Sequence, residues 1–484
     1  MLYQVPQNID SNKVFLINFS ELEGRLDPSI YKPQFKFVSK KYRNVKLSEI
    51  AWIDPICNFG KHKEVSFVPM DAIDPNYGVI AHKEVKRIEE VKGFTRFKEG
   101  DILWAKITPC MQNGKSAIAR NLLNGYGCGS TEFFVIRSKN EDVVKQDYLL
   151  FLLRDEKILK AAMNYFGGSA GQQRVSPLFL KTFNVPIPSL DEQISYCELV
   201  EQSQKIKRDK ELQAETLLSS IDNYLLSELG IQLPKVNSQT IRERIFTVNY
   251  SSVSGGRFDP KLYSISIIQL KQSLSMSPFT KQPLNNFIKN SCSGEWGKDE
   301  SEKVDENKYT KCLVIRATEF DNTYNLQLDN SRVKYRWIEN SKLSKMKIQA
   351  NDLLIEKSGG SEDQPVGRVS ILTDEVLKEK RIAYSNFIHK ITVEGINPVY
   401  LYFYLKTMHN IKITDSMQSQ TNGIRNLIMQ EYLNQTVIVP PLQKQQEIVD
   451  HITAIQQQAK ALQEEGKNIL EEAKKKVERM IIGD

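Results

Sequence analysis

A strand-like sequence gives way to a helical one at Val185-Pro186-Ile187-Pro188-Ser189-Leu190-Asp191-Glu192-Gln193. Pro188 suits the start of a helix, where a missing N–H costs little, and Ser189 is a residue type that caps helix N-termini. The chain then contains no proline or glycine until Gly230. We therefore predict a helix from Ser189 to Leu229, which at 1.5 Å per residue would be roughly 60 Å long.

The same transition recurs at Val437-Ile438-Val439-Pro440-Pro441-Leu442-Gln443-Lys444-Gln445. It predicts a second long helix from about Leu442 to Ile482, interrupted only by Gly466. The apolar side of this helix has the alternating spacing of three and four residues that is typical of a coiled-coil seam. The seam residues are Ile448, Ile452, Ile455, Ala459, Leu462, Gly466, Ile469, Ala473, Val477 and Met480. A helix with so narrow an apolar stripe needs a partner, so we predict that the two helices pair antiparallel; the alternative is that each packs on its own domain.

Other segments also recur in the same order, at an offset near 250 residues, which indicates an internal duplication. The matched pairs are Gly24–Tyr31 with Gly256–Tyr263, Gly100–Lys106 with Asn351–Lys357, Gly114–Ile118 with Gly367–Ile371, Tyr148–Leu153 with Tyr400–Leu405, and Arg174 with Arg425. Between them lie short apolar runs broken by Gly, Pro and Asn, which are typical of strands. The tracts 147–164 and 398–413 are predicted to be helical.

These patterns predict an α+β fold in which two tandem mixed α/β domains are joined by two long antiparallel helices that form a coiled-coil spacer, with a pseudo-twofold internal repeat. The predicted boundaries are 1–188 for the first domain, 189–231 for the central helix, 232–440 for the second domain and 441–484 for the C-terminal helix.

Composition excludes several classes of protein. The 484 residues are 40% hydrophobic, which is enough for a sizeable core. No apolar run reaches the ~18–20 residues of a membrane-spanning helix, and the N-terminus lacks the pattern of a secretory signal. The six cysteines form no CxxC pair, which argues against a disulfide scaffold or a structural zinc site. We expect a soluble cytoplasmic protein without a bound metal.

The net charge of +7 is unevenly distributed. Residues 1–188 carry +7, 189–232 carry −5, 233–440 carry +6 and 441–484 carry −1. The two predicted domains are therefore basic and the two helices are not. A basic domain is compatible with a polyanion partner, because Lys and Arg displace the counterions of phosphates. An ordinary solvated surface is the alternative.

Motifs of enzyme chemistry are incomplete in this sequence. Gly114-Lys115-Ser116 resembles the end of a phosphate-binding loop, but Pro109 replaces the first glycine of that motif. Asp74-Pro75-Asn76-Tyr77 resembles an adenine-methyltransferase motif, and a turn is the better interpretation. The pattern of Asp101 with Lys106, and of Asp352 with Glu356-Lys357, resembles a nuclease site without matching one. The five histidines have no metal-ligand spacing. The chain is predicted to be a binding protein and not an enzyme.

Taken together, the repeated motifs resemble the DNA-specificity (S) subunit of type I restriction–modification systems, over nearly the whole chain. Carriers of the resemblance are the Gly-Asp-Ile-Leu and Asn-Asp-Leu-Leu turns, Ser130-Thr131-Glu132-Phe133 with Ser385-Asn386-Phe387, and Phe67-Val68-Pro69-Met70 with Leu313–Ala317. The strongest is the helix start at Val185–Gln193, which is similar to the family's Ile-Pro-x-Pro-Pro-Leu-x-Glu-Gln. Ser189 stands where this motif has its last proline. In the second copy, Lys444 stands where the motif has glutamate.

This resemblance implies that each domain is a target-recognition domain that reads one half of a bipartite, asymmetric double-stranded DNA target. The helices would set the gap between the half-sites and dock two modification (methyltransferase) subunits, which use S-adenosylmethionine to methylate adenine. A restriction (motor–nuclease) subunit, which uses ATP and Mg, would cleave unmodified DNA in this phage-defence system. The chain itself would bind no cofactor. The rival interpretations are a nuclease or methyltransferase that acts alone, and a non-catalytic DNA-binding or scaffold subunit of a related phage-defence complex.

Candidate DNA contacts are polar residues in Gly-rich loops at matching places in the two halves, since phosphates are held by cations and base edges by Gln, Asn, Arg or Lys. In the first domain these are Lys61, Lys63, Lys106, Lys115, Gln172, Gln173 and Arg174. In the second they are Arg316, Lys357, Gln364, Arg368, Asn422 and Arg425. The alternative for each of these residues is that it is an ordinary solvated loop residue that does not contact DNA.

Overall fold

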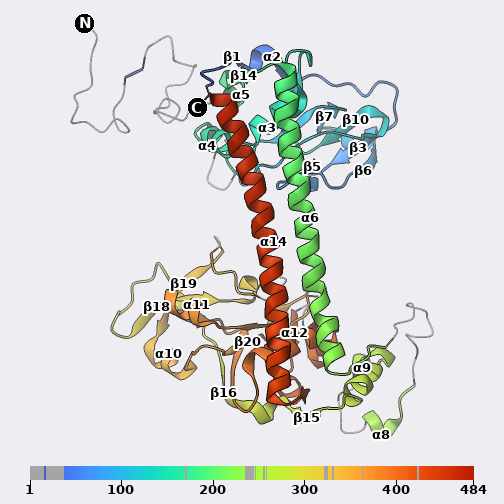
Figure 1. Ribbon diagram of the computed structural model, residues 1–484, viewed down its shortest axis with the longest axis vertical. Coiled ribbons are helices and arrows are strands. Elements are labelled where there is room, and N and C mark those ends of the chain that lie inside the picture. Colours follow the sequence, from blue (N-terminus) through green and yellow to red (C-terminus); the bar gives the residue numbers. More distant parts are fainter. Residues whose placement is uncertain are drawn as a thin grey trace. The chain divides into compact units, whose positions relative to one another are not determined.

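The chain forms two compact units, which are Met1–Leu212 with Leu462–Asp484 (unit 1) and Gln213–Ala461 (unit 2). Each combines small β-sheets, short helices and part of both long helices (Figure 1). The computed structural model describes residues 16–17, 38–168, 172–234, 245, 247–253, 257, 259–320, 325–329, 332–361, 364–421 and 424–483. No described helix is both long enough and apolar enough to cross a membrane.

The described strands and helices of the first half alternate along the chain. The strands are β1 (Arg43–Lys46), β2 (Ala51–Ile53), β3 (Glu64–Val68), β4 (Ile73–Asp74), β5 (Val79–Ile80), β6 (Glu84–Arg87), β7 (Thr95–Lys98), β8 (Ile102–Ala105), β9 (Ser116–Ile118), β10 (Tyr126–Gly129), β11 (Phe133–Ser138), β12 (Phe166–Gly167), β13 (Arg174–Val175) and β14 (Asn184–Ile187). The helices are α2 (Leu47–Ile50), α3 (Gln146–Leu153), α4 (Glu156–Met163), α5 (Pro177–Thr182) and the long α6 (Leu190–Glu228), with 3₁₀ turns η2 (Met70–Ala72), η3 (Ile88–Val91) and η4 (Leu123–Gly125).

The second half has the same kind of element order. Its strands are β15 (Thr280–Pro283), β16 (Ile288–Ser293), β17 (Lys298–Asp299), β18 (Tyr309–Ile315), β19 (Lys334–Glu339), β20 (Leu353–Glu356), β21 (Ser358–Gly360), β22 (Val369–Ile371), β23 (Ile382–Tyr384), β24 (Ile388–Val393), β25 (Gln418–Thr421), β26 (Ile424–Leu427) and β27 (Thr436–Val439). Its helices are α8 (Tyr250–Val253), α9 (Ile265–Ser275), α10 (Asn340–Met346), α11 (Asp374–Glu379), α12 (Pro398–Asn410), α13 (Met429–Leu433) and the long α14 (Leu442–Ile482), with 3₁₀ turns η5 (Pro260–Tyr263), η6 (Leu284–Phe287), η7 (Ala317–Glu319) and η8 (Ile413–Met417).

The sheets confirm the predicted duplication. The order β2-β11-β8-β9 in unit 1 corresponds to β16-β24-β20-β22 in unit 2. A second sheet is ordered β6-β3-β10-β7 in unit 1 and β17-β19-β18-β23 in unit 2, and each contains one parallel pair, β3–β10 and β18–β23. The edges differ, because β7 pairs with β10 whereas β17 pairs with β19. The two copies therefore share the central strands of both sheets and differ in which side of the second sheet carries an additional edge strand.

A buried carboxylate explains the repeated Asp-Ile-Leu and Asp-Leu-Leu turns. The carboxylate of Asp101 accepts the backbone N–H of Lys98 at 2.8 Å and pairs with Arg137 on β11 at 2.6 and 2.8 Å. Asp352 accepts the N–H of Gln349 at 2.9 Å and pairs with Lys390 on β24 at 3.0 Å. The aspartate thus closes its own turn and ties it to the neighbouring strand in both copies. The residue before it has a positive φ, 86° at Gly100 and 66° at Asn351, which Gly and Asn tolerate best.

The two long helices pair antiparallel, as predicted, and within each unit they share a hydrophobic core. In unit 1, Val200 of α6 belongs to the same core cluster as Val477 of α14. In unit 2, Leu225 of α6 belongs to a cluster with Ile448 of α14. The predicted seam of α14 is correct as far as Gly466 and again at Ala473 and Val477, which are both buried, but it is wrong by one residue at two places. Leu470 and Ile481 are buried in place of Ile469 and Met480, and Met480 is 42% exposed. Both buried residues pack into the unit 1 core, so the domain as well as the partner helix sets the buried face.

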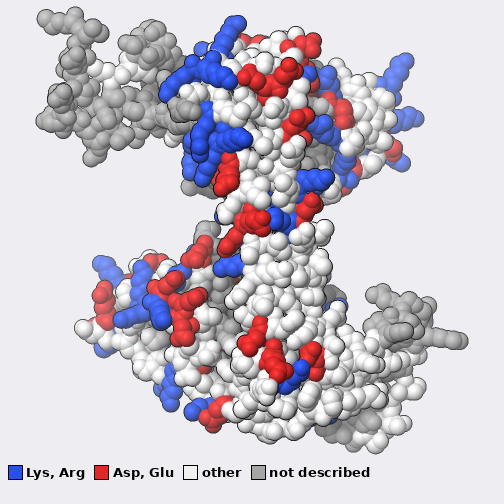
Figure 2. Space-filling view, viewed as in Figure 1, with Lys and Arg blue, Asp and Glu red and all other residues white. Residues whose placement is uncertain are grey.

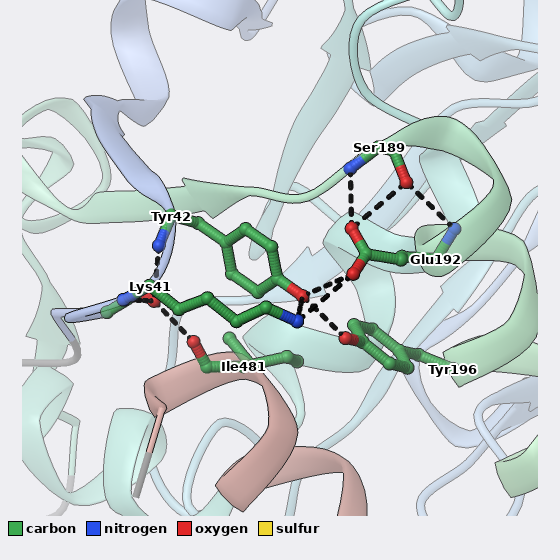
Figure 3. A network of polar contacts seen from close by, with 7 residues as sticks. Lys41, Tyr42, Ser189, Glu192, Tyr196 and Ile481 are labelled. Atoms are coloured by element: carbon green, nitrogen blue, oxygen red, sulfur yellow. Dashed lines mark hydrogen bonds and ion pairs between the residues drawn. The ribbon is translucent and has the colours of Figure 1, made fainter.

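Figure 3 shows how the start of α6 is held. Ser189 and Glu192 form a reciprocal capping box, in which Ser189 N–H donates to Glu192 at 3.1 Å and Glu192 N–H donates to Ser189 Oγ at 3.4 Å. Tyr42 Oη donates to the same carboxylate at 2.7 Å, and Lys41 pairs with it at 3.1 Å. These contacts, with that of Tyr42 first, lower the pKa of Glu192 to about 2, so it is ionised at neutral pH. The cap predicted from the sequence is confirmed.

Replacing Gly466 with leucine is expected to destabilise unit 1 by about 1–3 kcal/mol, because the site is already closely packed. A Cβ at position 466 would lie 3.1 Å from the Cα and 3.4 Å from the carbonyl oxygen of Lys207 on α6. Helix propensity alone would favour the leucine by nearly 1 kcal/mol, so the sign of the change reports on the helix contact. The check is urea denaturation, with hydrogen exchange of peptides around Lys207. Leucine at the exposed Gln463 is the control, and a Gly466→Leu variant as stable as this control would contradict the close approach.

Candidate DNA interface

Lys115 and Arg368, which are equivalent in the two repeats, both hold the two sheets of their domain together. Lys115 Nζ donates to the carbonyl of Met70, in the turn after β3, at 2.9 Å. Arg368 donates to the carbonyl of Ala317, in the equivalent turn after β18, at 3.1 Å. Arg368 is only 8% exposed and pairs with the buried Glu356 at 2.8 and 3.0 Å. These two cations are cross-links of the fold; Arg368 is buried and Lys115 half-buried, and their predicted contacts with DNA stay predictions.

Arg316 also has a structural partner. Its guanidinium donates to the carboxylate of Glu319 at 2.6 and 3.2 Å, and its backbone N–H donates to the same group at 2.7 Å. Glu319 is fully buried, so Arg316 compensates a charge that would otherwise be costly to bury. The expectation that Arg316 is a free loop cation is therefore not met.

The sequence match between Arg174 and Arg425 is displaced by one residue. Val175 N–H donates to the carbonyl of Lys106 at 2.9 Å, and Leu427 N–H donates to the carbonyl of the equivalent Lys357 at 2.7 Å. Arg174 therefore corresponds to Asn426. Because successive strand residues point to opposite faces, Arg425 lies on the other side and is 9% exposed. Arg425 is therefore not an exposed counterpart of Arg174, and its contact with DNA stays a prediction.

Four of the predicted residues of unit 1 come together around β13 and the end of β8, which are Lys106, Gln172, Gln173 and Arg174. The guanidinium of Arg174 donates from Nε to both oxygens of Glu132 at 3.1 and 2.9 Å, and from Nη2 to one of them at 2.7 Å. Its Nη1 donates to the carbonyl of Gln172 at 3.0 Å. The backbone N–H of Lys106 donates to the carbonyl of Glu132 at 2.9 Å, and that of Thr108 donates to the carbonyl of Gln173 at 2.9 Å. We call Lys106, Glu132, Gln172, Gln173 and Arg174 the Arg174 cluster.

Electrostatics keep this cluster charged. The hydrogen bonds and charge of Arg174 lower the pKa of Glu132 and outweigh the effect of its partial burial, and Lys106 contributes in the same direction. The same contact raises the pKa of Arg174. The ammonium of Lys106 lies 5.2 Å from the ring centroid of Phe134 and remains half-buried. Glu132 and Arg174 are therefore a fixed ion pair at neutral pH, beside a lysine without an ion-pair partner among the described residues.

A concavity of about 270 Å³ adjoins Lys106 and is lined by residues from both sheets of the domain, including Asp54, Arg96 and Phe133. The guanidinium of Arg96 lies 4.7 Å from the ring centroid of Phe59.

Sequence reasoning missed Arg96 and Glu132. The alternation of Thr95-Arg96-Phe97-Lys98, with Phe97 buried, was the available signal for Arg96, whereas nothing local marks Glu132. Lys61 and Lys63 are exposed in the loop before β3.

In unit 2, Lys357 has the place of Lys106 but different neighbours. Its Nζ donates to Ser293 Oγ at 3.0 Å, and that hydroxyl lies 3.4 Å from His389 Nδ1. Burial, together with the charge of Lys357, lowers the pKa of His389 to about 4, so this histidine is neutral at physiological pH. Phe387, which is 50% exposed, replaces Glu132. Gln364 is exposed nearby in the chain, and Asn422 lies outside the described residues.

The structure accounts for the incomplete enzyme motifs. Asp101, Asp352 and Glu356 are each paired with a cation of the framework. Asp74 accepts the N–H groups of Asn76 at 2.7 Å and Tyr77 at 3.3 Å, which confirms the turn. Within the part of the chain that the structure describes, no three His, Cys, Asp or Glu residues are grouped to hold a metal ion.

Figure 2 shows the distribution of charge on one face of the molecule. Lysine and arginine side chains intermingle there with aspartate and glutamate, and no continuous basic band covers this face. The net charges of the segments therefore do not translate into a uniformly basic surface on this side. Any DNA contact must be argued from particular clusters.

Comparison with known proteins identifies the family. The family "Type I restriction modification DNA specificity domain" matches twice, at residues 39–216 and 295–472. The specificity subunit of the type I restriction enzyme EcoAI of Escherichia coli is 34% identical over 219 residues, which is 42% of this chain and 37% of that protein. The EcoEI specificity subunit of Escherichia coli is 35% identical over 200 residues, 38% of this chain and 34% of that protein. The chain thus aligns with little more than a third of these relatives.

The fold is also found in a solved structure. A chain from a study of complex assembly and conformational transition of the type I R-M system aligns with a TM-score of 0.51 at 16% identity, covering 92% of this chain and 97% of that one. The specificity-subunit resemblance seen in the sequence is confirmed by the two domain matches, which together cover most of the chain. The chain belongs to the family of type I restriction–modification DNA-specificity proteins.

Proposed function

We propose that this chain is the non-catalytic subunit that selects the DNA sequence for a type I restriction–modification complex. Each recognition domain would read one half of a bipartite, asymmetric target, with domain limits at 1–188 and 232–440. The helices 189–231 and 441–484 would set the gap and dock two methyltransferase subunits. S-adenosylmethionine would bind to those subunits, and ATP and Mg to the motor–nuclease subunit.

The observation that carries this proposal is the repetition of one framework with different side chains at one place. Lys106 and Lys357 lie at equivalent positions, between strands that are bonded in the same way. Around them, Glu132 and Arg174 in unit 1 are replaced by Phe387 and Asn426 in unit 2. Both copies thus have a lysine at this place, and the polar and apolar groups beside it differ between the copies. Two domains that read different half-sites require such an arrangement, because phosphate contacts position a protein and base contacts specify the sequence.

The proposed contacts are now fewer than the sequence indicated. Lys61, Lys63, Lys106 and Lys357 remain candidates for phosphates, and Gln172, Gln173, Arg174 and Gln364 remain candidates for bases. Lys115, Arg316 and Arg368 hold structural partners and Arg425 is only 9% exposed, so we do not propose these four as contacts. Asn422 stays a prediction, because it lies outside the described residues.

The test is sequencing of methylated DNA from cells that lack other adenine methylation and carry the modification subunit with or without this chain. We expect one bipartite adenine-methylated motif that disappears when the chain is absent. If methylation is the same without the chain, the proposal is wrong.

The alternative, a scaffold that only binds protein, is then tested by measuring the affinity of the complex for random DNA at increasing salt. The affinity of a DNA-binding protein falls steeply as the salt concentration rises.

A further inference from the structure

The Glu132–Arg174 pair holds the guanidinium of an exposed arginine in a defined geometry. Nε and Nη2 of Arg174 face the carboxylate, and one N–H of Nη1 faces the carbonyl of Gln172. A guanidinium has five N–H groups. Three are thus used, and two remain, one on Nη1 and one on Nη2. The side chain is 44% exposed, so solvent reaches it.

We propose that Arg174 reads a guanine in the half-site of unit 1, with Glu132 as the positioning residue that fixes the guanidinium plane. A guanidinium with N–H donors left on both Nη1 and Nη2 suits the O6 and N7 acceptors that guanine presents in the major groove. This inference rests on the proposed function, and it adds the base that is read and the atoms that read it.

The charge balance favours a base over a phosphate. Glu132 lies within hydrogen-bond distance of Arg174 and neutralises it, so a phosphate approaching Arg174 would also meet a carboxylate. A neutral base edge meets two donors and no net repulsion. Lys106, which lies beside the pair without an ion-pair partner among the described residues, is the group suited to the DNA backbone.

Preorganisation strengthens the same assignment. A free arginine loses rotamer freedom when it binds, whereas the guanidinium of Arg174 is already held by contacts to Glu132 and Gln172. In unit 2 the equivalent positions hold Phe387 and Asn426, which cannot form this pair. The described residues at these two positions of unit 2 therefore do not repeat the proposed guanine reader.

The experiment uses the full chain with its modification subunit and sequences methylated DNA for Arg174→Ala, Arg174→Lys and Glu132→Gln. For Arg174→Ala we expect one guanine of one half-site to become any base, with discrimination at that position reduced about 10- to 100-fold, and the other half-site unchanged. Arg174→Lys should keep only part of the preference, because a lysine lacks the paired donors. Arg120→Ala, which removes an exposed arginine paired with Asp147 in the same unit, is the matched control and should leave the motif intact.

Glu132→Gln gives an independent readout. Without the carboxylate, Arg174 regains its full charge, so nonspecific affinity should rise and the slope of log affinity against log salt should steepen by about 1. An ion pair that only supports the fold would not move this slope. It would instead lower methylation at every position alike, together with thermal stability.

Each result decides the matter. If the wild-type chain directs no bipartite methylation, the proposed function fails. If the wild-type motif exists but Arg174→Ala keeps it base for base, the function stands and the guanine assignment is wrong. If Arg174→Ala does not fold, Arg174→Lys and Glu132→Gln carry the test, and the assignment is wrong if both leave the motif and the salt slope unchanged.

Discussion

Replacing Lys390 with methionine is expected to lower the free energy of unfolding of unit 2 by about 3–5 kcal/mol. The Nζ of Lys390 donates to Asp352 at 3.0 Å, to Thr392 Oγ1 at 2.9 Å and to the carbonyl of Lys347 at 3.1 Å. Both charged side chains are fully buried. Methionine fills a similar volume but leaves the carboxylate of Asp352 without its cation in an apolar interior.

Arg137→Met in unit 1 is the matched comparison for this prediction. Arg137 pairs with Asp101 in the equivalent turn, but its side chain is 21% exposed, so water can partly solvate the orphaned carboxylate. The loss there should be smaller. Combining Lys390→Met with Asp352→Leu should recover part of the stability, because no uncompensated charge stays buried, while the N–H of Gln349 still loses its acceptor. Urea denaturation, with hydrogen exchange of peptides from β20 and β24, assigns the loss to its unit. Equal losses of stability in Lys390→Met and Arg137→Met would contradict the claim that deeper burial of the ion pair makes the loss larger.

The long-range architecture was predictable because it depends on periodic features of the sequence. The proline-to-helix transition, the absence of glycine and proline from 189 to 229, and the spacing of α14 are local patterns with one physical meaning. The duplication was visible because the same turns recur in order. The period also predicts most of the seam of α14. It fails at Ile469 and Met480, where Leu470 and Ile481 are buried in the unit 1 core, because the domain as well as the partner helix decides which side is buried there.

The candidate site was harder to predict because exposure is not a local property. Lys115, Arg316 and Arg368 occur in sequences that look like free loops, yet their partners lie 45, 3 and 12 residues away along the chain. The mismatch of Arg174 with Arg425 arose from a single residue, which is enough to turn a strand side chain to the opposite face. Glu132 was missed because its role depends on a strand 42 residues further on.

Replacing Gln193 with methionine is expected to cost about 2–4 kcal/mol of the stability of unit 1, because three backbone groups, among them the buried carbonyl of Pro188, lose their hydrogen-bond partner. Gln193 is fully buried at the start of α6. Its Oε1 accepts the N–H of Lys145, just before α3, at 2.9 Å. Its Nε2 donates to the carbonyls of Val143 and Pro188, both at 3.0 Å. One amide thus fastens the loop before α3 to the beginning of the long helix.

The second copy repeats this arrangement and provides the comparison. Gln445 is 1% exposed, accepts the N–H of Asn397 before α12 at 2.9 Å and donates to the carbonyl of Pro440 at 2.8 Å. Gln445→Met should therefore destabilise unit 2, by a little less because only two groups lose a partner. Gln202→Met, at an exposed position of α6, should change stability by less than about 0.5 kcal/mol. Thermal unfolding and hydrogen exchange at residues 143–149 and 188–196 measure the effect. If Gln193→Met proves no worse than Gln202→Met, the glutamine that ends the repeated motif does not fasten helix to domain, and the motif needs another physical explanation.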